Sequence, residues 1–223
     1  MVQNYINSLE SEFQRNGNSV IAQEQKAYMR NQFDYYGIKA PERRVIQKLF
    51  LVKQNLPPKP DLATVVKVLW KKPQRDFQHF GQELTFKYVK QYRQSDIGLL
   101  EYMVTNKSWW DTVDFISVKL IGSYFRKYPK QRDHQIAAWM ESENIWLQRS
   151  CLLFLLKYKQ DLDKEFLSSV IKPLLGSKEF FINKAIGWVL REYSKTNSGW
   201  VIQYVDKTAL ESISKREALR LIK

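Results

Sequence analysis

The sequence predicts an all-α protein, an α-solenoid built from pairs of helices. Tyrosines end four helical segments at nearly constant intervals of 36, 34 and 35 residues, and a shorter amphipathic helix precedes each segment. No stretch alternates apolar and polar residues for long enough to predict a β-sheet. A two-helix unit that recurs at such a length is typical of solenoids, in which neighbouring units stack and share a core. The four tyrosines are Tyr88, Tyr124, Tyr158 and Tyr193.

Helical signals run along the chain from its start. Residues 4–13 and 21–35 predict two helices, and Pro41 at a first helical position predicts the start of a third. The proline-rich stretch 57–60 then interrupts the pattern, because proline cannot continue a helix. The long helices that end in tyrosine follow at residues 77–88, 110–124, 146–158 and 181–193.

Two serines have the sequence context of helix starts. Ser108 precedes an acidic residue, Asp111, which suits the positive end of a helix, so Ser108 is predicted to be an N-cap. Ser214 and Glu217 have the spacing of a capping box, in which each side chain binds the other residue's backbone N–H.

The composition indicates a folded protein rather than a disordered or fibrous one. With 223 residues, of which 44% are hydrophobic, the chain can bury a sizeable core, and we expect residues 1–223 to form a single domain. No apolar run reaches 18 residues, and the first residues lack the basic-then-apolar pattern of a signal peptide. Cys151 is the only cysteine and is expected to pack as a small apolar residue. These features predict a cytoplasmic protein without membrane contact.

The net charge of +13 and the isoelectric point near 9.7 favour a polyanionic partner. Lysine and arginine are spread along the whole chain rather than gathered in one tail, so a folded surface carries the charge. Nucleic acid and an anionic membrane both fit this property. The alternative is a well-solvated surface with no such partner.

Counting back nine or ten residues from each tyrosine gives a charged or polar residue in four successive units: His79, Asp114, Arg149 and Lys184. A core position would be apolar in all four units, so this column of residues is expected to line the concave surface that solenoids use for binding. Trp110 comes one helical turn before the column, and Trp188 comes one turn after it. The pattern thus predicts two indoles beside a carboxylate that lies among cations.

The residue types limit the chemistry that this column can perform. His79 and His134 are the only histidines and belong to different units, so neither a metal nor a cofactor is expected. A lone carboxylate beside aromatic rings on a basic surface suits a reaction in which positive charge develops on a phosphate-bearing substrate. Hydrolysis of an N-glycosidic bond is one such reaction. The simpler interpretation is that Asp114 forms an ion pair with a neighbouring Lys or Arg and that Trp110 packs in the core.

Three segments are long enough to carry a resemblance: SWWDTVD at residues 108–114, NIWLQR at 144–149 and KEFFINKAIGWVLREY at 178–193. The shorter PERR at 41–44 and SKREA at 214–218 agree with them. In these motifs, and along essentially its whole length, the chain resembles the AlkD-type DNA alkylation-repair glycosylases.

The resemblance implies a HEAT-like repeat fold that holds duplex DNA in a basic concave groove. It also implies a monofunctional glycosylase of base excision repair that removes cationic purines such as 3-methyladenine and 7-methylguanine without metal or cofactor. Matched residue by residue, Asp114 corresponds to the catalytic carboxylate, and Trp110 and Trp188 correspond to the indoles that pack on the lesion's deoxyribose. Arg149 corresponds to the arginine on the DNA backbone. Such an enzyme would act on nucleoid DNA in a bacterial cytoplasm.

Three further cations are candidate DNA-binding residues. Lys184 belongs to the column, although an exposed lysine often contacts nothing specific. Arg191 lies on the same helix and could instead interact with the helix dipole. Arg44 could contact DNA at the end of the groove.

Two classes of function remain open, and both involve a monomer. The first is the glycosylase, in which Asp114 either activates water or stabilises positive charge. The second is a HEAT-like module that binds nucleic acid without breaking a bond. The combination of Asp114, Trp110 and Trp188 favours the enzyme, because phosphate binding alone does not call for a carboxylate in the groove.

Overall fold

A computed structural model describes residues 2–222, and the secondary structure of this part of the chain is helical throughout. An isolated bridge between Asp34 and Gln74 is the single β-type pairing among these residues. The all-α class is confirmed, and the succession of short helices is consistent with an α-solenoid. The chain divides into two compact units, Met1–Arg93 and Gln94–Lys223. The expectation of one domain over residues 1–223 stays a prediction.

The first unit ends in a helical pair of the predicted kind. The α4 helix packs against α5, whose end is followed by Tyr88, and Tyr88 donates a hydrogen bond to the carbonyl of Pro57 just before α4. The α-helices of this unit are α1 (Val2–Arg15), α2 (Ser19–Tyr28), α3 (Ala40–Gln47), α4 (Leu62–Lys71) and α5 (Arg75–Phe86). Its 3-10 segments are η1 (Lys48–Leu51), η2 (Lys53–Asn55), η3 (Lys59–Asp61) and η4 (Val89–Gln91).

The helix predicted at residues 21–35 is shorter than expected, since α2 ends at Tyr28. Arg30 and Asn31 have φ angles of 54° and 56°, which place both residues in the left-handed region. A left-handed residue stops an α-helix by turning the chain away from the helix axis. The second half of the prediction was therefore wrong, because the sequence there carries no glycine or proline that signals a stop.

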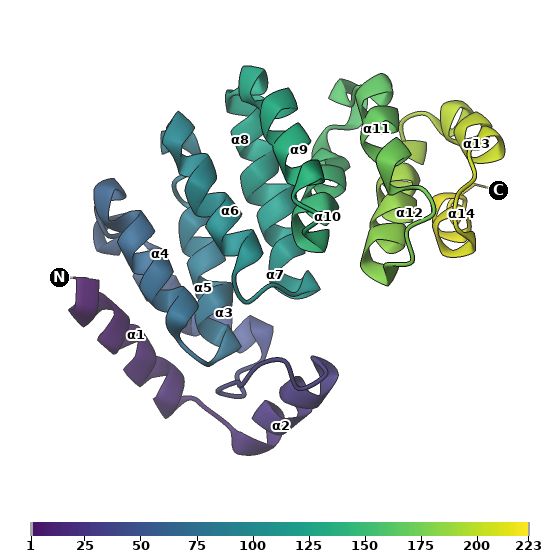
Figure 1. Cartoon of the computed structure of the whole chain (residues 1–223). Helices are drawn as coiled ribbons and strands as arrows, with labels where there is room; N and C mark the ends of the chain where they lie inside the picture. The colour runs from purple at the N-terminus through teal and green to yellow at the C-terminus, as the bar shows by residue number, and fades with distance from the viewer. Residues whose placement is uncertain (1, 223) are drawn as a thin grey trace. The chain divides into compact units, whose positions relative to one another are not determined.

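The second unit consists of helical pairs in which a short helix precedes a long one (Figure 1). The short helices are α6 (Ile97–Thr105), α9 (Arg132–Glu141) and α11 (Lys164–Ile171). The long ones are α7 (Trp110–Phe115) with the π-helix η6 (Ile116–Ile121) and α8 (Gly122–Lys127), then α10 (Ile145–Leu153) with η8 (Phe154–Lys157), then α12 (Phe180–Ser194). The unit ends with α13 (Ser198–Lys207) and α14 (Ser212–Ala218), and its remaining 3-10 segments are η5 (Gln94–Asp96), η7 (Pro129–Gln131), η9 (Lys159–Asp161) and η10 (Lys172–Leu174).

The tyrosines at the ends of the long helices fasten the pairs together. Tyr124 donates a hydrogen bond to the carbonyl of Gln94 at 2.8 Å, which ties the end of one long helix to the start of the pair. Tyr158 donates to the carbonyl of Gly122 at 3.0 Å, which ties one long helix to the preceding one. The regular spacing of the tyrosines therefore marks real contacts between helices.

The core of the described residues is largely apolar. Leu152–Leu156 are all buried, as expected for a helix covered on both sides. Trp70 and Trp139 are both 2% exposed and act as packing anchors. Cys151 is fully buried, and burial raises the pKa of its thiol, so the residue packs as a neutral apolar group.

Gly122 marks the closest approach between two long helices. A Cβ atom added there would lie 2.9 Å from the carbonyl oxygen of Phe154, which is backbone and cannot rotate away. We expect Gly122→Ala to lower the free energy of unfolding by about 1–3 kcal/mol, the usual cost of overpacking. Urea denaturation measures the change.

Gly98→Ala is the matched control, because a Cβ at this helical position meets no atom within 4 Å. It should leave stability unchanged or raise it by up to about 1 kcal/mol through helix propensity. Equal effects of the two substitutions would contradict the close approach at Gly122.

Candidate active site

The candidate site lies where three long helices of the second unit meet, and it begins with Asp114 on α7. This helix starts at Trp110, while Trp109 occupies the N-cap position with extended backbone and no side-chain cap. The predicted cap, Ser108, is wrong: its hydroxyl donates to the carbonyl of Val104 at 2.6 Å and so closes the preceding helix instead. Trp110 and Asp114, four residues apart, share a face of α7.

Asp114 forms a bidentate ion pair with Arg149 of α10. The Nε of Arg149 donates to Oδ1 at 2.8 Å, and Nη2 donates to Oδ2 at 2.9 Å. The Nη1 of Arg149 donates to the carbonyl of Phe181 at 2.5 Å, near the start of α12. The Arg149 side chain is 4% exposed and that of Asp114 is 18% exposed. The arginine thus joins three consecutive long helices, and the carboxylate keeps a partly open side.

Burial sets the electrostatics of this carboxylate. It raises the pKa of Asp114 above its ordinary value, and the nearby Asp111 adds to the rise. The hydrogen bonds and the positive charge of Arg149 act in the opposite direction and favour the ionised form. Asp114 is therefore a largely desolvated carboxylate with a fixed counterion. Because little water surrounds it, solvent screens its charge only weakly.

The open side of Asp114 faces a pocket of about 270 Å³ that it shares with Trp188 of α12. Trp110 lies one turn earlier on α7, outside this lining. Three apolar residues and three charged ones complete the lining: Phe115, Val118 and Leu156, then Lys119, Lys157 and Glu192. The structure thus places Asp114 and Trp188 on one pocket and leaves Trp110 outside its lining; their roles stay predictions.

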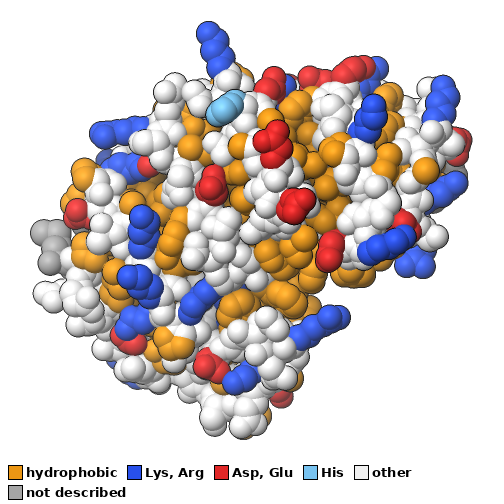
Figure 2. Space-filling model, viewed as in Figure 1, with side chains coloured by type: hydrophobic (Ala, Val, Ile, Leu, Met, Phe, Trp, Pro, Cys, Tyr) orange, Lys and Arg blue, Asp and Glu red, His pale blue; other side chains and the backbone are white. Residues whose placement is uncertain are grey.

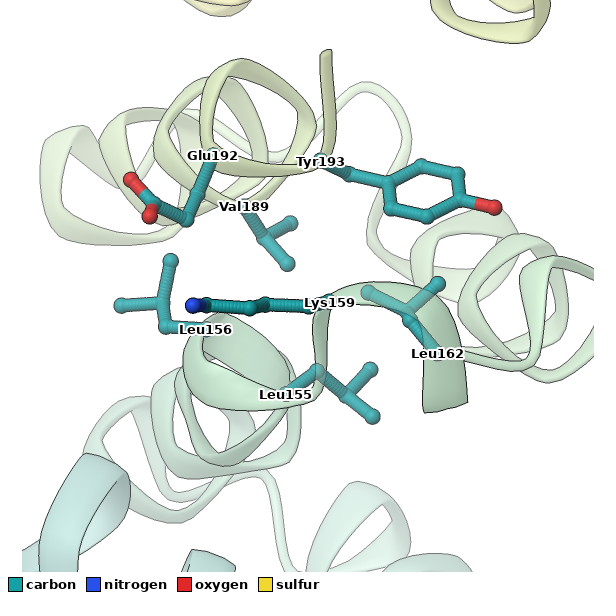
Figure 3. A pocket seen from close by; sticks show the side chains of 7 residues that line it. All are labelled: Leu155, Leu156, Lys159, Leu162, Val189, Glu192 and Tyr193. Atoms are coloured by element: carbon teal, nitrogen blue, oxygen red, sulfur yellow. The ribbon is translucent and has the colours of Figure 1, made fainter. Parts of the chain in front are cut away.

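A second cavity between η8 and α12 is too small for a ligand. Its volume is about 10 Å³, roughly the room that one water needs, and leucine and valine side chains make up most of its wall (Figure 3). Glu192 lines both this gap and the larger pocket. We interpret the gap as imperfect packing rather than as part of the site.

An aromatic layer supports the buried arginine from below. The rings of Trp109, Trp146 and Phe181 lie 5.0–5.8 Å apart, and the Arg149 guanidinium carbon lies 5.8 Å from the centre of the Phe181 ring. The sequence alone assigns no role to any of these three residues. All three stand at the starts of long helices, 37 and 35 residues apart, and this spacing could have revealed them.

Hydroxyl groups join the same two helices beside the ion pair. The Oγ atoms of Ser117 and Ser150 are hydrogen-bonded to each other at 2.8 Å, and both side chains are fully buried. Ser117 belongs to the π-helix η6, which follows Asp114 after one residue. π-Helical turns inside α-helices are frequent at functional sites.

The other predicted DNA-binding residues lie outside this pocket. Lys184 and Arg191 of α12 both form ion pairs with Glu217 of α14. Arg44 belongs to the first unit, where its 65% exposed side chain lies 3.8 Å from a carboxylate oxygen of Glu83. Within residues 2–222 there is no group of three or more His, Cys, Asp or Glu side chains that could hold a metal ion.

These features define an all-helical protein whose candidate site is a desolvated carboxylate–arginine pair beside an indole. Residues 9–222 match the family model described as DNA alkylation repair enzyme. The match covers nearly the whole chain, so the protein belongs to the DNA alkylation repair enzyme family and has a role in DNA repair.

A solved structure points to the same family. The chain is similar to a predicted DNA alkylation repair enzyme from Enterococcus faecalis, with 31% sequence identity and a TM-score of 0.86. The similarity covers 92% of this chain and 96% of that one. No curated protein sequence matches the chain significantly. Among the described residues, every helix falls short of the length and apolar character that a membrane crossing requires.

The ion pair between Asp114 and Arg149 should make the free energy of unfolding depend on pH. Arg149→Ala leaves a buried carboxylate without its counterion, which should cost about 3–5 kcal/mol of unfolding free energy at neutral pH. The pKa of Asp114 then rises further, and a group with a raised pKa destabilises the fold only at pH values where it ionises. The deficit should therefore shrink as the pH falls and Asp114 takes up a proton. Urea denaturation of both proteins at neutral and mildly acidic pH tests this.

Arg15→Ala provides the control for a general loss of one cation. Arg15 is 73% exposed and pairs with Glu12 on the surface of α1. Its removal should cost less than about 1 kcal/mol at either pH. A deficit of Arg149→Ala that is the same at both pH values would contradict the coupling to Asp114.

Proposed function

We propose that the protein is a monofunctional DNA glycosylase that hydrolyses the N-glycosidic bond of cationic alkylated purines, such as 3-methyladenine and 7-methylguanine, in duplex DNA. The observation that carries this proposal is the desolvated carboxylate of Asp114, which shares an open pocket with Trp188 and is held by a buried arginine. Membership of the DNA alkylation repair enzyme family supports DNA as the substrate.

The charge on Asp114 suits the transition state of this reaction. As the bond between C1′ and the purine nitrogen breaks, its electron pair goes to the base, which leaves as a neutral purine. The deoxyribose becomes oxocarbenium-like and carries the positive charge. A fixed carboxylate in a poorly solvated pocket stabilises that charge more in the transition state than in the ground state, which is the requirement for catalysis. Water then attacks C1′ and loses its proton to Asp114 or to solvent.

The indoles complete the environment of the sugar. The proposal places the deoxyribose of the damaged nucleotide against Trp188 and Trp110, whose electron-rich faces attract a developing cation. The lesion itself is already cationic and so has a weakened glycosidic bond. The enzyme therefore needs no general acid for the leaving base.

Arg149 receives two roles in this proposal. Three of its five N–H groups bind Asp114 and the carbonyl of Phe181, so it positions the carboxylate and favours its ionised form. Two N–H groups are left over, and these would donate to the phosphate of the damaged nucleotide. The contact between Arg149 and the DNA backbone stays a proposal: the side chain is 4% exposed, so a phosphate would have to reach these two N–H groups through a small opening.

The wider interface stays a proposal built on sequence and charge. We propose that the two-helix units are HEAT-like repeats and that Lys184, Arg191 and Arg44 contact DNA along a basic concave groove. On the face shown in Figure 2, lysine and arginine side chains are scattered among acidic and apolar ones. The net charge of +13 supports DNA binding in general. The monomeric state and the cytoplasmic location stay predictions.

The second candidate is a module that binds DNA without cleaving it, which the net charge alone would explain. Replacing the carboxylate separates the two candidates. We expect Asp114→Asn to lower the rate of base release from methylated duplex by about 100-fold or more, in line with the loss of one charge-stabilising group. Its DNA affinity should be equal or greater, because one negative charge is removed.

The experiment scores free 3-methyladenine and 7-methylguanine released by both proteins at saturating enzyme. Release by the wild-type protein alone would support the glycosylase and the role of Asp114 together. Normal turnover by Asp114→Asn would show that another group is responsible. DNA binding by both proteins without release by either would favour the binding module.

The proposed contact at Arg44 predicts a change in salt dependence. Loss of one phosphate contact should reduce the slope of log K against log salt concentration by about 0.9. Arg44→Ala is therefore expected to weaken DNA binding and to flatten the slope by this amount. Arg15→Ala removes the same charge from the same unit and should leave the slope nearly unchanged. Fluorescence anisotropy titrations at several salt concentrations measure both, and equal slopes for the two variants would contradict a contact at Arg44.

A further inference from the structure

A buried carboxylate gathers cations at the C-terminal end of the chain. Glu217 of α14, whose side chain is 7% exposed, forms ion pairs with Lys184 at 2.5 Å, with Arg191, and with Arg220 at 3.9 Å. The capping box predicted for Ser214 and Glu217 is wrong, because α14 begins at Ser212 and Ser214 instead donates a hydrogen bond to the carbonyl of Asn183 on α12. Glu217 is therefore free of a capping role and binds side chains instead.

Close packing between α12 and α14 fixes the position of this carboxylate. A Cβ atom added at Gly187 would lie 2.6 Å from the Cβ of Glu217 and 2.8 Å from the carbonyl oxygen of Ser214. The glycine thus lets the backbone of α14 approach α12 closely. This packing places the Glu217 side chain beside α12, where its carboxylate pairs with Lys184 and Arg191.

The cluster carries more positive than negative charge. Burial lowers the pKa of Lys184, and repulsion from Arg191, Arg220 and Arg216 lowers it further. One carboxylate, Glu217, pairs with three of these four cations. A fixed group of like charges that exceeds its counterion attracts an external anion.

Two cations of the cluster lie on the same helix as Trp188, which lines the pocket of the candidate catalytic carboxylate. Lys184, Trp188 and Arg191 recur at intervals of four and three residues, so they share one face of α12. With a rise of about 1.5 Å per residue, both cations lie within roughly 6 Å of Trp188 along the helix axis. An anion bound by the cluster would therefore lie close to a sugar that packs on Trp188.

We propose that Lys184, Arg191 and Arg220, held in place by Glu217, form a binding site for a DNA phosphodiester next to the nucleotide whose sugar packs on Trp188. Glu217 is a positioning residue in this site, although its own charge is negative. The inference rests on the proposed function, which brings DNA to Trp188. Beyond that function, the inference adds Arg220 as a DNA contact and makes the acidic residue Glu217 a requirement for DNA binding.

Replacement of Glu217 distinguishes DNA binding by positioned cations from DNA binding by a generally basic surface. Glu217→Gln raises the net charge by one, so a diffuse basic surface would bind DNA more tightly after the change. A site that depends on positioned cations binds DNA more weakly, because Lys184, Arg191 and Arg220 lose the group that orients them. We expect undamaged duplex to bind roughly tenfold more weakly at 0.1 M salt, the effect of losing one phosphate contact.

Glu211→Gln is the matched control. Glu211 lies at the start of the same helix, pairs with the exposed Lys178 at 3.5 Å and carries the same charge. Its replacement should leave DNA affinity unchanged or slightly increased. Fluorescence anisotropy of both variants with undamaged duplex at several salt concentrations provides the comparison, and tighter binding by both variants would overturn the positioning role.

Arg220→Ala keeps the inference testable if Glu217→Gln fails to fold. Arg220 is 68% exposed, so its removal leaves the packing of α12 and α14 intact. It should flatten the salt slope by about 0.9. An unchanged slope, with wild-type protein that binds DNA, would overturn the phosphate site.

Base release by the wild-type protein is measured in parallel and separates the two proposals. Release together with unchanged binding by Arg220→Ala and Glu217→Gln would reject the phosphate site alone. DNA binding that weakens in both variants, without base release by the wild type, would reject the glycosylase and retain the phosphate site.

Discussion

The buried ion pair between Asp114 and Arg149 is the interaction on which the site depends. A charge of either sign would be costly at this depth without its partner, and here the bidentate geometry satisfies both groups. The third hydrogen bond of Arg149, to the carbonyl of Phe181, extends the link to α12, which carries Trp188. One arginine therefore sets the position of the carboxylate relative to both neighbouring helices. A buried ion pair is a weak source of stability, but it is an effective way to hold an ionised carboxylate in a poorly solvated pocket.

The helical pairs make this ion pair possible. Because the long helices repeat every 34–36 residues, residues 114, 149 and 184 occupy equivalent places on adjacent helices. Close contact at Gly122 and the hydrogen bond from Tyr158 to its carbonyl keep two of these helices at short distance. The Arg149 guanidinium is almost fully buried, and the ring of Phe181 lies 5.8 Å from it. The equivalent residue on the next long helix, Lys184, also forms an ion pair. Its partner is Glu217 of α14 rather than a residue of the preceding long helix.

Much of the fold and part of the site could be predicted from the sequence. The tyrosine spacing and helical periodicity located the long helices, because both reflect contacts that every unit repeats. The shared pocket of Asp114 and Trp188 followed from the same register. An ion pair of Asp114 with a neighbouring Lys or Arg was one of the two interpretations of the sequence, and the structure contains it. The sequence could not single out Arg149 as the partner, since an exposed and a buried arginine look alike in sequence and only helix packing decides between them. The end of α2 at Tyr28 and the tertiary use of Ser214 and Glu217 were missed for a related reason. The local sequence predicted that the α2 helix continues and that Ser214 caps the last helix. In the structure two left-handed residues end α2, and Ser214 bonds to α12 instead.

The measurement that tests the account most directly is a double-mutant cycle on the rate of base release. Single-turnover release from methylated duplex, at enzyme concentrations that saturate the DNA, would be compared for wild type, Asp114→Asn, Arg149→Ala and the double variant. If Arg149 acts in the chemical step through Asp114, the double variant should be no slower than Asp114→Asn alone. Losses that multiply in the double variant would contradict the account, because they would show that the arginine and the carboxylate contribute independently.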